Sequence, residues 1–228
     1  MDTSMENFSN WFLQNRFELL TQARKWKKDN IQLEKEFLIE WPLERIKIME
    51  LDEYIIGKGP ENKSLCYELE FGKYRGLYLS IKGGSSAKFG IYWSKKHHAY
   101  CDKINQPIPE LKLRSEFEKL KTDLIAILEA GVAKDFGNSA FSYSNSFFTR
   151  SSLITNLLCI YADLNSYSGI NMSLDEAIWG NLCSIDRSDS VYRQNHELIK
   201  LMIKNFPELD SYLLSSMLWK YRDYVLKC

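Results

Sequence analysis

The sequence predicts an α+β fold in which a small antiparallel sheet is packed with amphipathic helices. Over most of the chain, apolar residues recur every three or four positions, as they do in helices. One stretch, Leu65–Trp93, instead combines strand-forming residues with glycine-containing turns. With 228 residues, of which 45% are hydrophobic and 26% charged, the chain is long enough to bury an extensive core.

Helices are expected throughout the first 54 residues. Over Met5–Lys28 the apolar residues fall on one helical face, and the helix ends in the basic run Arg24–Lys28. This run suits a solvated helix end, with an auxiliary phosphate contact as the alternative. A further turn or two is expected over Leu33–Glu40, a proline-initiated helix over Pro42–Met49, and a short helical step over Leu51–Tyr54.

Three consecutive strands are expected next. Alternating residues and short turns place them at Leu65–Phe71, Arg75–Ile81 and Ala87–Trp93. A turn at Gly72–Tyr74 and a glycine- and serine-rich connection at Lys82–Ser86 join them, so an antiparallel meander is the simplest arrangement. The aromatic segment 136–148 is expected to extend this sheet or to form an ordered loop.

The remainder is predicted to be helical after a polar loop that contains Pro107 and Pro109. Helices are expected over Leu113–Ala130 with Gly131 as terminator, Ser152–Leu164, Ser173–Trp179 with a capping box, Val191–Asn205 and Glu208–Leu226. These elements predict a single domain with an N-terminal helical part (1–54), a β-rich core (55–150) and a C-terminal helical part (151–228).

Charge is segregated along a chain whose formal net charge is zero. Between Lys63 and Lys96 there are seven positive and two negative residues, so this segment carries +5 and the rest −5. Such segregation favours a polyanion as partner, with basic and small polar groups on phosphates and aromatic rings on bases. The residues expected to bind nucleic acid are Lys73, Arg75, Lys82, Gly83, Gly84, Ser85, Ser86, Lys88, Tyr92 and Trp93. The alternative is an ordinary hairpin turn whose basic residues protect a sheet edge.

Four motifs add a family resemblance. They are FLIEWPL at Phe37–Leu43, LDEY at Leu51–Tyr54, the pair Cys66–Tyr67, and GGSSAKFGIY at Gly83–Tyr92. Together they resemble the N-terminal DNA-recognition domain of bacterial McrB-like restriction proteins, where it precedes an AAA+ motor.

The resemblance implies a DNA-binding specificity module of a restriction or phage-defence system that recognises modified DNA. Its implied partners are DNA, an AAA+ motor domain in cis or in trans, and an associated nuclease. Two departures from the family pattern, Ile55–Gly57 and Glu68, leave the choice of base or modification open.

Two other function classes stay open. A metal-dependent nuclease would use Glu68 and Glu70 with Lys73 and Lys82, although the spacing of Glu70 and Lys73 on a strand disfavours this. A protein-interaction module would dock through the C-terminal residues Trp179, Tyr212, Leu213, Met217, Trp219, Tyr221 and Tyr224.

No enzymatic activity, cofactor or metal site is predicted. His97, His98 and Cys101 lack a second pair of ligands, which a metal site normally has. Five scattered cysteines without CxxC spacing indicate a reducing compartment. The polar N-terminus and the absence of a bilayer-length apolar run in the sequence predict a cytoplasmic protein without a membrane partner.

Overall fold

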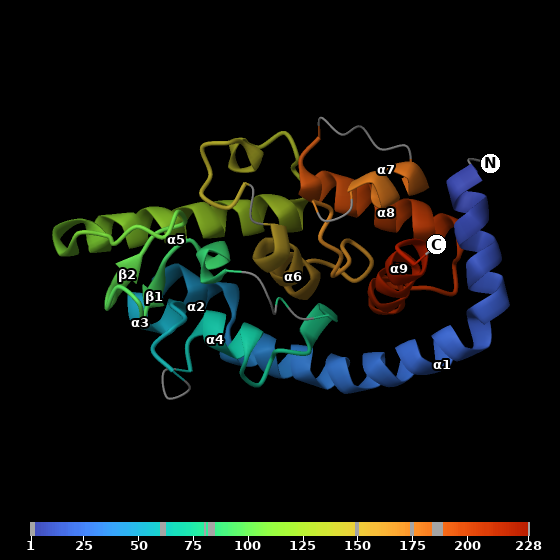
Figure 1. The fold of residues 1–228 in the computed structure, drawn as a ribbon, viewed down its shortest axis with the longest axis horizontal. Coiled ribbons are helices and arrows are strands. Elements are labelled where there is room, and N and C mark those ends of the chain that lie inside the picture. The colour runs from blue at the N-terminus through green and yellow to red at the C-terminus, as the bar shows by residue number, and fades with distance from the viewer. Residues whose placement is uncertain are drawn as a thin grey trace.

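The computed structural model describes residues 3–59, 63–79, 81, 85–148, 151–173, 176–183 and 189–227. Helices dominate, and a two-stranded antiparallel sheet lies near one end of the elongated molecule (Figure 1). The predicted class, helices around a small antiparallel sheet, is confirmed. The elements are α1 (Thr3–Glu40), α2 (Leu43–Ile48), α3 (Leu51–Tyr54), α4 (Leu65–Glu70), η2 (Leu77–Leu79), η3 (Ser86–Phe89), β1 (Tyr92–Ser94), β2 (Ala99–Cys101), α5 (Glu110–Ala133), η4 (Ser139–Phe141), α6 (Ser151–Tyr161), α7 (Glu176–Cys183), α8 (Val191–Asn205) and α9 (Ser211–Val225).

The long helix α1 bends around one end of the molecule and then runs along its side (Figure 1). It replaces the two helices expected over Met5–Lys28 and Leu33–Glu40. The linking residues 29–32 contain neither glycine nor proline, and Asn30 Nδ2 donates to Trp26 O at 2.9 Å within the helix. The helix therefore continues without a break.

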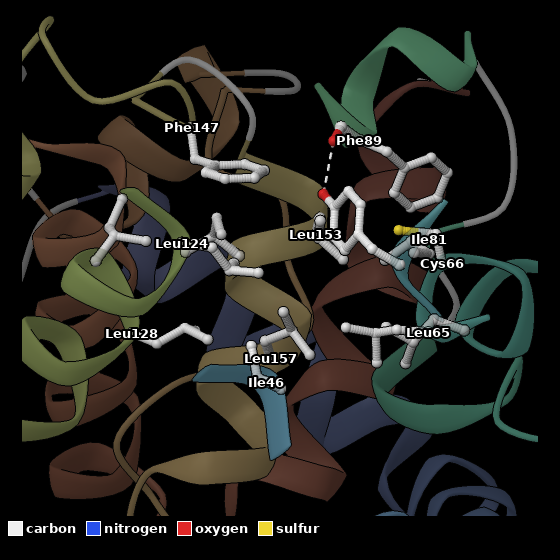
Figure 2. Packing of buried hydrophobic residues seen from close by; sticks show 14 of the residues in the cluster. Ile46, Leu65, Cys66, Ile81, Phe89, Leu124, Leu128, Phe147, Leu153 and Leu157 are labelled. Carbon is white, nitrogen blue, oxygen red and sulfur yellow. Dashed lines mark hydrogen bonds between the residues drawn. The ribbon is translucent and has the colours of Figure 1, made fainter. Parts of the chain in front are cut away.

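The first hydrophobic cluster gathers α2 to α6 around the end of α1. Figure 2 shows Leu124, Leu128, Leu153, Leu157, Ile46, Phe147, Leu65, Cys66, Ile81 and Phe89 packed in it. Helix α5 runs through Gly131, so the predicted termination there is wrong. A Cβ at Gly131 would lie 2.4 Å from Leu158 Cδ2, so the glycine allows close approach of α5 and α6. The helix ends at Ala133, and the following residue, Lys134, caps it in the left-handed conformation with φ +60°.

The second hydrophobic cluster joins the N-terminal half of α1 to α7, α8 and α9. Phe8 is central to it, with its ring centroid 5.0 Å from that of Tyr221 in edge-to-face contact. Helix α9 begins at the cap Asp210, whose side chain accepts from Leu213 N at 3.0 Å. The two clusters share α1, and the organisation of the chain as one domain stays a prediction.

The expected meander over Leu65–Trp93 is wrong. Its first strand is helix α4, its second contains the short helix η2, and its third contains η3 and only the beginning of β1. Strand β2 lies in the segment that was expected to be a loop. Segment 136–148 forms turns and η4 instead of a strand, so the described part of 55–150 is not β-rich.

Helix α4 shows why alternation misleads in this segment. Leu65 and Leu69 are four residues apart, a spacing that puts both on one face of a strand and also on one face of a helix. Cys66 is buried as well, whereas on a strand it would point to the opposite face from Leu65 and Leu69. The Ser64 side chain accepts from Tyr67 N at 3.3 Å and caps the helix N-terminus.

Candidate nucleic-acid interface

A short β-hairpin presents the exposed cations of the basic stretch. Its strands pair Tyr92 with Cys101, Trp93 with Tyr100, and Ser94 with Ala99. The turn between them is the hairpin tip, defined here as Lys95, Lys96, His97 and His98. All four tip residues are exposed, and within the described part of the chain their side chains have no hydrogen bond or ion pair.

Neighbouring segments fix the hairpin along both edges. Trp93 N donates to Ile56 O at 2.9 Å on one side, and Ile108 N donates to Tyr100 O at 2.8 Å on the other. Gly57 has φ +112°, and a Cβ there would lie 2.1 Å from Trp93 O. Only glycine allows the backbone to approach β1 this closely. The tip therefore projects from an anchored support.

The aromatic pair below the tip, Trp93 and Tyr100, is half-buried and already engaged in internal contacts. The rings of Trp93 and Tyr100 meet edge to face, with centroids 5.1 Å apart. Lys58 Nζ lies 5.7 Å and 5.1 Å from these two ring centroids, and it also pairs with Asp52 Oδ1 at 2.7 Å. This arrangement argues against Trp93 as an open platform for base stacking.

Lys88 is held inside the protein. Its Nζ lies 2.6 Å from Glu70 Oε1 and donates to Ile81 O at 2.7 Å. The side chains of Lys88 and Glu70 are only 12% and 5% exposed. A paired ammonium with so little exposure is poorly placed to reach a phosphate, so the geometry argues for a structural role.

Tyr92 also serves the fold in this structure. Its ring is buried, and its hydroxyl donates to Asn105 Oδ1 at 2.7 Å. The contact ties β1 to the loop that follows β2. This placement supports a structural role for Tyr92.

The turn after α4 holds two predicted residues with different surroundings. Lys73 Nζ lies 3.0 Å from Glu36 Oε2 and 4.9 Å from the centroid of the Tyr74 ring. Hydrogen bonds to Tyr74 and Glu36 raise the pKa of Lys73 above its ordinary value. Arg75 is exposed, and its side chain has neither a hydrogen bond nor an ion pair with any described residue.

The glycine- and serine-rich connection is described only in part. Lys82, Gly83 and Gly84 lie outside the described residues. Ser85 is exposed and caps η3, where its Oγ accepts from Ala87 N at 3.2 Å, and Ser86 is half-buried. Among the described predicted residues, Arg75 and Ser85 are open, while Lys88 and Tyr92 are turned to internal contacts.

The hairpin tip is absent from the residues that the sequence predicts to bind nucleic acid. Lys95 and Lys96 belong to the basic stretch, and His97 and His98 were considered only as metal ligands. One sequence pattern could have indicated this hairpin. The four polar residues of the tip lie between Trp93 and Tyr100, two aromatic residues that can pair across neighbouring strands.

The carboxylates of the nuclease alternative are used elsewhere. Glu68 is buried, and its Oε2 accepts from Lys73 N at 2.7 Å, while Glu70 pairs with Lys88. Both carboxylates lie on helix α4, not on the strand that was predicted to place them on one face. In the described part of the chain, no three His, Cys, Asp or Glu side chains gather closely enough to hold a metal ion.

Most of the proposed docking residues on the C-terminal helices form core. Those buried are Trp179, Tyr212, Leu213, Met217 and Tyr221. Tyr224 remains 48% exposed. The excess of aromatic residues is therefore explained mainly by internal packing.

Comparison with known proteins gives no match to a protein-family model, to a curated protein or to a solved structure. Within the described ranges, every helix is too short or too polar to cross a lipid bilayer. Function is therefore inferred from the site geometry and from the motif resemblance.

Proposed function

We propose that this chain is a DNA-binding specificity module that contacts the phosphate backbone through the hairpin tip. The observation that carries the proposal is the presence of unpaired, exposed lysines, Lys95 and Lys96, on an anchored hairpin of the described chain. A lysine that neutralises a phosphate releases a counterion from DNA, which favours binding. A lysine without an internal partner can do this without first breaking an ion pair, so it should contribute most to affinity. Among the described residues that the sequence predicts to bind nucleic acid, Arg75 and Ser85 are exposed and have no ion pair, whereas the exposed Lys73 pairs with Glu36.

The motif resemblance supports the biological setting of this proposal. We place the module in the cytoplasm, in a restriction or phage-defence system that recognises modified DNA. An AAA+ motor domain, in cis or in trans, and a separate nuclease are its proposed partners. The module itself is proposed to be non-catalytic, with strand cleavage left to the nuclease.

The contacts of Trp93 and Tyr100 favour phosphate contacts over base stacking at the hairpin. Because Trp93 and Tyr100 cover each other and Lys58 caps both, base stacking at the hairpin requires these contacts to break. Phosphate contacts from the tip require no such rearrangement. Duplex DNA is therefore the expected partner, bound with a strong dependence on salt.

Fluorescence anisotropy with a labelled duplex at several salt concentrations tests the proposal. The double variant Lys95→Ala with Lys96→Ala should lower affinity by roughly tenfold or more at low salt. It should also reduce the slope of log K against log salt by about 2, because each phosphate that is no longer neutralised lowers this slope by about 0.9. Methylated, hydroxymethylated and single-stranded probes then report selectivity.

The matched control removes two positive charges from a helix far from the hairpin tip. Lys200 and Lys204 lie on α8, towards the other end of the molecule (Figure 1). Changing both to alanine should leave affinity and salt slope nearly unchanged. Equal losses of affinity from both double variants would show that only net charge matters, and an unaffected tip variant would reject the assigned surface.

A further inference from the structure

A cavity of about 610 Å³ lies between the first three turns of α1, helix α7 and the last turns of α9. These elements meet at the end of the molecule opposite the hairpin (Figure 1). The volume falls within the usual range for small-molecule sites. The cavity is therefore separate from the proposed DNA surface.

The described lining contains no charged side chain. A phosphate, carboxylate or ammonium group entering the cavity would lose hydration and gain no opposite charge from this lining. This composition disfavours nucleotides, acidic metabolites and the DNA backbone. It fits an uncharged ligand.

One wall of the cavity is aromatic. Trp11 and Tyr221 have ring centroids 5.2 Å apart, and Tyr224 lies 6.1 Å from Trp11. Phe8 packs on both Trp11 and Tyr221, which are 8% and 5% exposed and so are held rigidly. The Trp11 ring is inclined by 58° to that of Tyr221 and by 32° to that of Tyr224. The wall is bent and provides no parallel slot for a flat base.

The rim carries four carboxamide side chains, those of Asn7, Asn10, Gln14 and Asn181. The first three lie at spacings of three and four along α1, so they share one helical face. None of the four has a hydrogen bond to another described residue. By contrast, Asn15 and Gln32 on the same helix donate to Trp11 O and Glu36 Oε1.

Each of these rim carboxamides offers both donors and an acceptor. Hydroxyl groups also donate and accept, and a sugar ring has hydroxyls at its edge and C–H groups on its faces. The C–H faces suit an aromatic wall, and the hydroxyls suit the carboxamide rim. From this combination we propose that the cavity is a binding site for a neutral saccharide.

Isothermal titration calorimetry with maltose, cellobiose, methyl glucoside and N-acetylglucosamine tests this site. At least one of these sugars should give saturable binding, with glucose 6-phosphate much weaker than methyl glucoside. Tyr224→Ala should reduce affinity by roughly tenfold, and Asn181→Ala by severalfold, because each removes a side chain that faces the ligand. Both residues belong to the exposed class, with Tyr224 48% exposed, so the fold should survive.

The matched control is Gln32→Ala, which removes a carboxamide from α1 outside the cavity and should leave sugar binding unchanged. Three outcomes overturn the proposal: no saturation by any sugar, binding of adenosine or thymidine in place of sugars, or glucose 6-phosphate binding as tightly as methyl glucoside. Each outcome is independent of DNA binding, so the two proposals fail separately.

Discussion

Lysines from one basic stretch have opposite surroundings in this fold. The Lys88 side chain is only 12% exposed and pairs with Glu70, whereas Lys95 and Lys96 are exposed and have no partner among the described residues. In the sequence, these three lysines contribute equally to the net charge of the segment. Only the tertiary structure determines which charge is neutralised internally and which remains to attract a polyanion.

The largest expected effect comes from breaking the buried pair. Lys88→Ala leaves the Glu70 carboxylate buried without its cation, so the free energy of unfolding should fall by about 3–5 kcal/mol. Urea denaturation measures this change in stability. DNA affinity per folded molecule should stay close to that of the unchanged protein.

The double variant Lys88→Met with Glu70→Leu is the control for this pair. Removing both charges together should restore much of the stability, because no unpaired charge remains. If Lys88→Ala is stable but binds DNA weakly with a reduced salt slope, Lys88 contacts phosphate, and it then belongs with the exposed lysines of the tip.

The support of the hairpin tip can be broken at Gly57. Gly57→Ala places a Cβ 2.1 Å from Trp93 O at a residue with φ +112°, which should cost about 2 kcal/mol or more. DNA affinity should fall as well, because the tip loses its fixed position. Thermal unfolding and anisotropy measure the two effects.

Gly76→Ala is the matched control for the change at Gly57. The heavy atom nearest to a Cβ at Gly76 is Asn30 Oδ1 at 3.9 Å, which is an ordinary van der Waals distance. This change should alter stability by less than about 1 kcal/mol. Equal stability of the two alanine variants would show that the Gly57 backbone is not pressed against β1.

The amphipathic helices could be predicted from local sequence, but the candidate nucleic-acid interface could not. Val191–Asn205 has the bounds expected from its periodicity, because an amphipathic helix carries its signal within itself. Lys88 and Glu70 are 18 residues apart, and no local pattern predicts that they pair. The spacing of Leu65 and Leu69 fits a strand and a helix equally well. The sequence alone therefore does not show that this segment is a helix that also buries Cys66.

Glu34 has a buried carboxylate oxygen, and no cation in the described part of the chain pairs with it. Its Oε2 is buried and has no hydrogen-bond partner among the described residues, and burial raises the pKa of Glu34 to about 7 despite a hydrogen bond from Tyr78. The folded state then binds the proton more tightly than the unfolded state. The stability from this group is present at low pH and is lost as pH rises through about 7.

Glu34→Gln should remove this pH dependence. The variant should match the unchanged protein near pH 5 and exceed its stability by about 1 kcal/mol near pH 8, after allowance for partial exposure of the carboxyl. Urea denaturation at both pH values measures the difference. The exposed change Glu116→Gln serves as the control, and a gain that is independent of pH would contradict the assignment.

The smallest effect is expected at Lys73, whose surroundings lie between the two extremes. It pairs with Glu36 at 3.0 Å, but its side chain is 47% exposed, so water already screens the pair. Lys73→Ala should therefore change stability less than any of the test variants above, and it should lower the salt slope less than Lys95→Ala does. Urea denaturation measures the change in stability, and anisotropy measures the change in salt slope. Together they rank Lys88, Lys73 and Lys95 by how far each contributes to the fold or to DNA binding. A reduction of salt slope at Lys73 equal to that at Lys95 would mean that Glu36 releases this side chain to DNA, and that an exposed ion pair does not prevent a lysine from binding phosphate.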